Sequence, residues 1–138
     1  MPFTPSHAVV ALPFVRTPLV PAAIAIGAMT PDLRLFLRFF PLHYGRTHSF
    51  AWLPATIVVA LGLLLVWRCI LRPAARELSP DWLAARLPME WDRGSAAALR
   101  ETFGIRKDTD LGWSRLRGIA LLLVSLALGI ATHIVWDL

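Results

Sequence analysis

Two long apolar runs constrain this chain of 138 residues more than any other feature of its sequence. The first, at 50–71, reads FAWLPATIVVALGLLLVWRCIL and carries one charge, Arg68. The second, at 118–136, reads GIALLLVSLALGIATHIVW and carries one ionisable side chain, His133. About 20 helical residues cross a hydrocarbon core of about 30 Å. The two runs therefore predict two membrane-spanning helices.

The alternative is a pair of buried core helices in a soluble domain. The chain is 57% hydrophobic and only 17% charged, whereas soluble domains average about 25% charged residues. A chain this short has too little polar surface to cover two such helices. We therefore predict an all-α integral membrane bundle that forms a single membrane domain over 1–138.

The N-terminal third predicts a short helical hairpin over 5–29. Its apolar residues run over 8–15 and 19–29, interrupted by prolines that disfavour helix interiors. Thr17-Pro18 forms a favourable cap and first-position pair. Two helices follow, at about 5–15 and 18–29, each about 17 Å long and too short to span. One kinked span is the alternative. No basic residue precedes the apolar run, so we expect no secretory signal.

A further helix is predicted over 31–40, where Thr30-Pro31 repeats the cap-then-proline pattern. Its sequence DLRLFLRFF places Arg34 and Arg38 four residues apart on one face. This composition is typical of a helix lying in the membrane interface. A connecting loop follows at 41–49.

The segment 72–117 is polar and connects the two predicted spans. It holds nine bases and seven acids, and weak signals predict short helices at 79–88 and 95–103. Because the acids interleave with the bases, no nucleic-acid-binding stripe is expected. With Arg16 and Arg68, this side holds eleven bases against three opposite. The positive-inside rule therefore predicts a multi-pass protein of a bacterial inner membrane with 72–117 cytoplasmic.

Several ionisable residues outside that segment are predicted to gather at one membrane face. If the N-terminal helices form a hairpin, the alternating chain direction brings five of them opposite the polar segment. These candidate metal ligands are His7, Asp32, His48, His133 and Asp137. Imidazole and carboxylate ligands suit zinc, with manganese or iron as alternatives. His133 and Asp137 are four residues apart, so they share one helix face and could bind one ion or bridge two.

Such a site would activate water for hydrolysis. A bound divalent ion lowers the pKa of its water to about 7 and can polarise a phosphoryl group. Arg46, two residues before His48, is the candidate phosphate-binding base. Each residue also has a simpler interpretation: Asp32 as a helix-dipole partner, His7 as a first-turn residue, His48 as an interfacial side chain, and Asp137 as the end of a span. We expect His43 to be a loop residue. His133 is the hardest to explain simply, because ionisable groups inside spans are usually functional.

The blocks MPFTPSHAVVALP, IGAMTPDL, RTHSF and THIVWD resemble an uncharacterised bacterial membrane family, that of domain of unknown function 4184. They are also similar to membrane-bound metal-dependent hydrolases of the inner membrane. The ligand order further resembles zinc-dependent phospholipase C and single-strand nucleases. These resemblances imply that the five candidates are metal ligands. Members of the first family continue beyond the WD block with a further histidine, so the chain is expected to be truncated at its C-terminus.

Three functional hypotheses follow. The first is a metal-dependent hydrolase of a phosphoester or lipid-linked substrate at the outer face of the membrane. The second is a non-catalytic membrane protein that keeps a structural metal or has lost it. The third is a transporter or proton path through His133, which would require a homo-oligomer because the spans are few. Membrane lipid is the expected partner in each case.

Overall fold

The computed structural model describes residues 4–37, 39, 41, 43–105 and 112–137, and all regular structure within them is helical. In chain order the elements are α1 (Thr4–His7), the 3-10 helix η1 (Ala8–Phe14), α2 (Pro21–Met29), η2 (Thr30–Asp32), α3 (Leu33–Phe36), α4 (Tyr44–Thr47), η3 (Phe50–Trp52), α5 (Leu53–Val66), the π-helical turn η4 (Trp67–Leu71), α6 (Arg72–Glu77), α7 (Asp81–Ala84), η5 (Met89–Asp92), α8 (Ser95–Thr102) and α9 (Trp113–Trp136). The prediction of an all-α fold is confirmed. The chain forms two compact units, Met1–Gly62 with Ala120–Leu138, and Leu63–Ile119.

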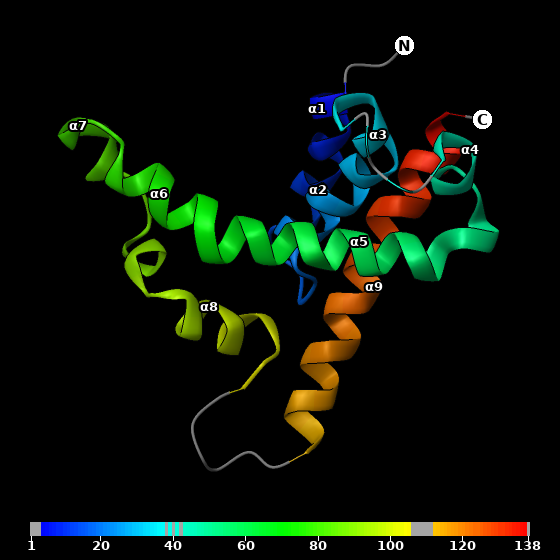
Figure 1. Ribbon diagram of the computed structural model, residues 1–138. Helices are drawn as coiled ribbons and strands as arrows, with labels where there is room; N and C mark the ends of the chain where they lie inside the picture. Colours follow the sequence, from blue (N-terminus) through cyan, green and yellow to red (C-terminus); the bar gives the residue numbers. More distant parts are fainter. Residues whose placement is uncertain (1–3, 38, 40, 42, 106–111, 138) are drawn as a thin grey trace. The chain divides into compact units, whose positions relative to one another are not determined.

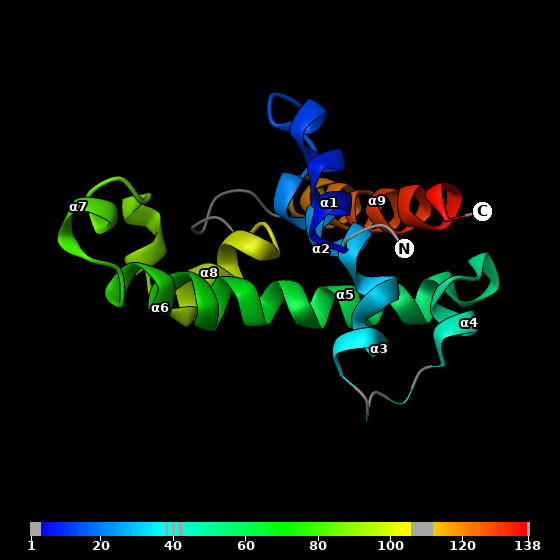
Figure 2. The ribbon, with the colours of Figure 1, turned by 90° about the horizontal axis from the view of Figure 1, so that it is seen from above.

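Two helices are long and apolar enough to cross a membrane. The first, Phe50–Glu77, is continuous through η3, α5, η4 and α6, and the second is α9 (Figures 1 and 2). Both extend beyond the predicted runs into flanking polar residues. Only 17% of the most apolar stretch of the first helix and 39% of that of the second is buried. A core helix of a soluble domain would be mostly buried, so these helices leave much of their apolar surface uncovered.

The N-terminal hairpin is present, but its second helix begins three residues later than predicted. The η1 and α2 segments pack against each other. Thr17 does not cap a helix; its hydroxyl donates to the Phe14 carbonyl at 2.8 Å and closes the turn. Val20 is the extended residue before Pro21, and its N–H donates to Ser125 Oγ on α9 at 2.9 Å. This long-range hydrogen bond satisfies a free donor at the helix start, which explains why Pro21 and not Pro18 opens the helix.

Helices α2 and α9 approach each other closely at two glycines. A Cβ on Gly27 would lie 2.6 Å from the Leu126 carbonyl oxygen. A Cβ on Gly129 would overlap the Ile24 carbonyl oxygen and the Ala28 nitrogen. Small residues at a helix crossing let two backbones come together, a device common in membrane helix pairs. The crossing places the last turns of α9 beside the end of α2.

The helix predicted over 31–40 is shorter than expected. Thr30 does not cap it; the Thr30 hydroxyl donates to the Ile26 carbonyl at 2.6 Å, and α2 passes almost directly into η2 and α3. The helical backbone ends at Phe36, and Leu37 is extended. The Leu37 N–H donates to the Leu33 carbonyl oxygen at 2.9 Å and closes the last helical turn. Arg34 lies within α3, whereas Arg38 lies outside the described residues.

In the unit Leu63–Ile119 the polar segment folds back onto a row of arginines. Arg68 Nη1 donates to Thr102 Oγ1 at 3.0 Å, and Arg72 Nη2 lies 3.1 Å from Glu101 Oε2. Arg76 Nε lies 2.9 Å from Asp92 Oδ2. The predicted helices of this segment are found as α7 and α8, with η5 between them. The charges of the connecting segment therefore compensate arginines at the end of the first long helix.

Candidate metal centre

Asp32 and His48 are brought together by a hydrogen bond between their neighbours. Asp32 ends η2 and is only 4% exposed. Thr47, at the end of α4, is buried, and its hydroxyl contacts the Pro31 carbonyl oxygen at 2.8 Å. This bond ties α4 to η2 across 16 residues. Since Thr47 and Pro31 each precede a candidate ligand, the tie holds His48 against Asp32.

His133 and Asp137 come from the C-terminal end of α9. The His133 side chain is completely buried, and its Nδ1 lies 2.6 Å from the Ala28 carbonyl oxygen. A carbonyl oxygen only accepts hydrogen bonds, so Nδ1 carries the hydrogen and donates it. Nε2 of the neutral ring is then left with its lone pair. Asp137 follows one helical turn later, and its carboxylate Oδ2 lies 3.2 Å from that Nε2.

His48 is oriented in the same way as His133. Its Nδ1 lies 3.0 Å from the Tyr44 carbonyl oxygen, so this nitrogen also donates its hydrogen to the backbone. The Tyr44 ring stacks on the imidazole with centroids 3.9 Å apart. Burial, followed by the negative charges of Asp32 and Asp137, raises the pKa of Tyr44. Backbone carbonyls that fix histidine rings in this manner are typical of the surroundings of metal ligands.

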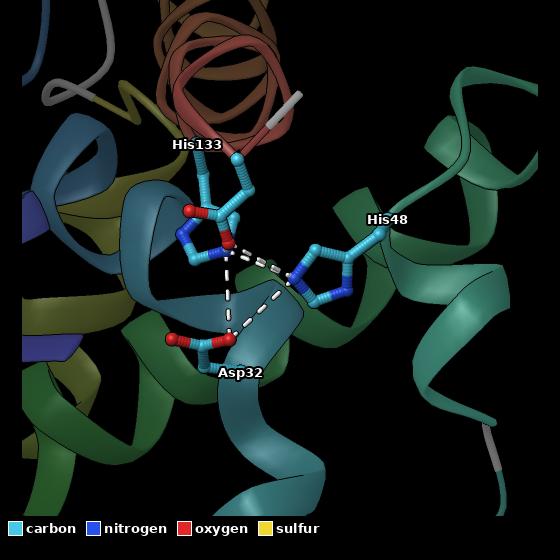
Figure 3. Close-up of side chains that lie close together, drawn as sticks. Asp32, His48 and His133 are labelled. Atoms are coloured by element: carbon cyan, nitrogen blue, oxygen red, sulfur yellow. Dashed lines mark hydrogen bonds and ion pairs between the residues drawn. The ribbon is translucent and has the colours of Figure 1, made fainter. Parts of the chain in front are cut away.

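The side chains of Asp32, His48 and His133 converge (Figure 3), and one ligand atom from each of them and from Asp137 lies within 4.8 Å of the others. His48 Nε2 and His133 Nε2 are 3.1 Å apart. Asp32 Oδ1 lies 3.5 Å from each of these nitrogens, and Asp137 Oδ2 lies 3.6 and 3.2 Å from them. Zinc bonds of about 2.05 Å in a tetrahedron give edges of about 3.3 Å. Five of the six distances between the ligand atoms are thus close to this value, and the sixth, from Asp32 to Asp137, is at most 4.8 Å.

None of the four ligand atoms carries a hydrogen that it could donate to another when the imidazoles are neutral and the carboxylates are ionised. Both imidazoles donate through Nδ1, so in their neutral forms both Nε2 atoms are acceptors. Ionised carboxylates are acceptors only. Four converging acceptors repel one another unless a positive charge lies among them. A divalent cation supplies that charge, and added protons on the imidazoles are the alternative.

One side of the group is more open than the other. The side chains of His133 and Asp32 are 0% and 5% exposed, whereas those of His48 and Asp137 are 13% and 18% exposed. Solvent therefore reaches the group from the side of His48 and Asp137. A metal held here would have a closed inner side and a partly accessible outer one.

The remaining candidate residues lie outside this group of four ligand atoms. The His7 ring is 4.2 Å from that of His133 between centroids, outside the four-atom set. His7 is buried, and its Nε2 has no hydrogen-bond partner in the described structure. The Arg46 guanidinium lies over the Trp52 ring, 4.6 Å from its centroid. His43 is exposed and precedes α4, in agreement with its interpretation as a loop residue.

Sequence reasoning missed the groups that orient the ligands. The Ala28 and Tyr44 carbonyls have no signal of their own, because any residue supplies a backbone oxygen. Thr47 offered a weak sequence signal, because it directly precedes the candidate ligand His48. The prediction of a connecting loop at 41–49 missed the short helix α4. This helix places Tyr44 and His48 four residues apart, so that their rings stack.

The site defines a class of helical protein in which two histidines and two aspartates, drawn from both halves of the chain, form a candidate metal centre. The chain belongs to the family described as domain of unknown function (DUF4184), whose model matches residues 1–138. The predicted family is thus confirmed. Comparison with curated proteins and with solved structures finds no match.

Proposed function

We propose that this protein is a membrane-bound, metal-dependent hydrolase of phosphoesters. The observation that carries the proposal is the convergence of Asp32, His48, His133 and Asp137, with both imidazoles oriented by backbone carbonyls. Zinc is the proposed metal, because its bond lengths fit the spacing and it accepts imidazole and carboxylate together. Manganese and iron take the same ligands.

Each ligand has a distinct role in this proposal. His133 and Asp32 form the buried inner side of the site and hold the metal in place. His48 and Asp137 form the accessible side, where a substrate oxygen or a water would approach. Zinc can expand to five ligands, which leaves room for this additional oxygen. When bound, the metal supplies an acidified water and polarises the phosphoryl group.

Arg46 and His7 have supporting roles. Arg46 is an exposed base on the same short helix that leads to His48, and we propose that it binds the phosphate from its position over Trp52. His7 would become a ligand only if a second ion binds beside the first. Paired ions in hydrolases lie about 3.5–4 Å apart, and the His7 ring lies next to the ligand His133.

The test is metal-dependent cleavage of phosphoesters by protein purified in detergent. Mono- and diesters of a chromogenic phenol are assayed after loading with zinc, manganese or iron. We expect hydrolysis that a chelator abolishes and that His133→Ala and Asp137→Ala lose. The matched control is His43→Ala, which removes an exposed histidine outside the group and should retain activity. Metal-loaded protein without activity on any ester would contradict the proposal.

A second function, a structural metal, is favoured by one observation. Four protein ligands close a tetrahedral zinc site, whereas catalytic zinc usually has three and one open position. A structural ion would staple α2, α4 and α9 together. In that case His133→Ala would lower thermal stability, and no ester would be cleaved under any metal. The activity assay and a melting experiment on the same variants separate the two functions.

We further propose that the two long helices insert in a bacterial inner membrane with 72–117 in the cytoplasm. The support is their length, their apolar composition and their mostly uncovered surface. The 3.1 Å approach of His48 to His133 brings the residues just before the first long helix beside the last turns of α9. Extraction of membranes with alkaline carbonate tests insertion, and release of the protein into the supernatant would contradict it.

A further inference from the structure

A pocket of about 390 Å³ lies beside the candidate metal centre, between the start of the N-terminal hairpin and the end of α9. Its lining consists of Ser6, His7, Val9, Val10, Thr132 and Trp136. None of these side chains is among the four candidate ligands. His7 connects the two features, because it lines the pocket while its ring lies against that of His133, with centroids 4.2 Å apart. The volume is within the range of small-molecule sites.

The lining is mostly apolar, and the lining side chain that contacts the metal centre, His7, is polar. Val9, Val10 and Trp136 provide aliphatic and aromatic walls. The Thr132 hydroxyl is already used, since it donates to the Gly129 carbonyl at 2.7 Å. His7 Nε2 is different, being buried and without a hydrogen-bond partner in the described structure. A ligand with an apolar body and a polar end beside His7 would suit this distribution.

An exposed apolar row leads away from the pocket along η1. A 3-10 helix has three residues per turn, so side chains three apart line up. Val9, Leu12 and Val15 have this spacing, and they are 59%, 65% and 61% exposed. Val9 belongs to both the pocket and the row. Trp136, at the other wall, is 77% exposed and offers an aromatic ring of the kind found at membrane interfaces.

We propose that this pocket binds the alkyl chain of a lipid phosphoester whose phosphate is held at the metal centre. The inference rests on the proposed function for the position of the phosphate. From the head group, the alkyl chain passes between Val10 and Trp136 and continues outward along the row of Val9, Leu12 and Val15. His7 Nε2 donates to, or accepts from, a polar atom of the head group.

The experiment uses a long-chain alkylphosphonate with a photoreactive diazirine on its chain, added to the full-length protein in lipid nanodiscs. After illumination, labelled residues are located by mass spectrometry. We expect labels concentrated in 6–15 and 132–136. Excess unlabelled long-chain alkylphosphonate should suppress them, and methylphosphonate should not. Labels spread evenly over other exposed apolar residues, such as Val58, would overturn the inference.

A pocket-filling variant provides an independent check. Thr132→Trp should reduce labelling about five-fold, because a filled pocket excludes the chain. Val58→Trp, a change at an exposed position of α5, should label like wild type. Zinc content is measured on each preparation. Bound zinc without pocket labelling would overturn the lipid pocket and leave the hydrolase proposal intact. Pocket labelling without any metal would support the lipid pocket and contradict the hydrolase proposal.

Discussion

His48 Nε2 and His133 Nε2 lie 3.1 Å apart. Each ring donates its Nδ1 hydrogen to a backbone carbonyl, so neither neutral ring has a hydrogen on Nε2. A hydrogen bond between the two nitrogens would need one extra proton. The residues are 85 positions apart, and each comes from a different long-helix terminus. Two aspartates complete the group, so a divalent cation is the simplest partner for all four side chains.

Thr47→Val should weaken both the fold and metal binding. The substitution keeps the shape of the side chain but removes the hydroxyl that joins α4 to the Pro31 carbonyl. Loss of this buried hydrogen bond should reduce the free energy of unfolding by about 1–2 kcal/mol. Zinc affinity, measured with a fluorescent competitor, should also fall, because His48 loses its anchor. Thr56→Val is the control; it removes a local hydroxyl bond to Trp52 and should leave zinc affinity unchanged.

Gly129→Ala should disturb the site through the helix crossing. The added methyl group would overlap the Ile24 carbonyl oxygen and the Ala28 nitrogen, so α2 must move away from α9. Overpacking of this kind costs about 1–3 kcal/mol. Because Ala28 also holds His133, metal affinity should drop together with the melting temperature. Gly62→Ala meets open space and should be neutral or more stable by about 0.5–1 kcal/mol. Equal behaviour of the two variants would contradict the role assigned to the crossing.

Glu101→Gln should destabilise the unit Leu63–Ile119 without affecting the metal. Glu101 compensates Arg68 and Arg72, whose side chains are each only 9% exposed. Since the carboxylate itself is 46% exposed, we expect a loss of only about 1 kcal/mol. Hydrogen exchange of α8 measures the loss. Glu90→Gln, where only the backbone carbonyl contacts Arg72, should exchange like wild type.

Zinc affinity should fall as the pH is lowered. The imidazoles and carboxylates bind metal in their deprotonated forms, so protons compete with the ion. Titration with a competitor dye should show affinity greatest near about pH 8 and at least about ten-fold weaker near about pH 5. Metal loss should lower the melting temperature at acidic pH. An affinity independent of pH would mean that zinc binds through groups other than these histidines.

The helical class, the two long helices and most of the site could be predicted from sequence. Hydropathy predicts the long helices, and the structure brings together Asp32, His48, His133 and Asp137, which the alternating chain direction had predicted to lie at one face. The exact start of the second helix depended on a contact between residues far apart in the sequence. Pro18 and Pro21 both suit a helix start, and only the bond from Val20 to Ser125 selects the second.

Other features depended on contacts that no local pattern encodes. Gly27 and Gly129 are visible in the sequence, but their pairing across two helices is not. The connecting segment appeared as a solvated polar stretch, whereas Glu101 and Asp92 pair with arginines of the first long helix. His7 was predicted to lie at the same face as the other candidates. In the structure its ring lies against that of His133, and it is not part of the four-atom group.

The most direct test is the metal content of protein purified in detergent without an affinity metal. Elemental analysis is applied to wild type, His133→Ala, Asp137→Ala and the control His43→Ala. We predict about one zinc, manganese or iron ion per chain in wild type and in the control, and almost none in the other two. Wild-type protein that holds no metal even after reconstitution would contradict the metal centre.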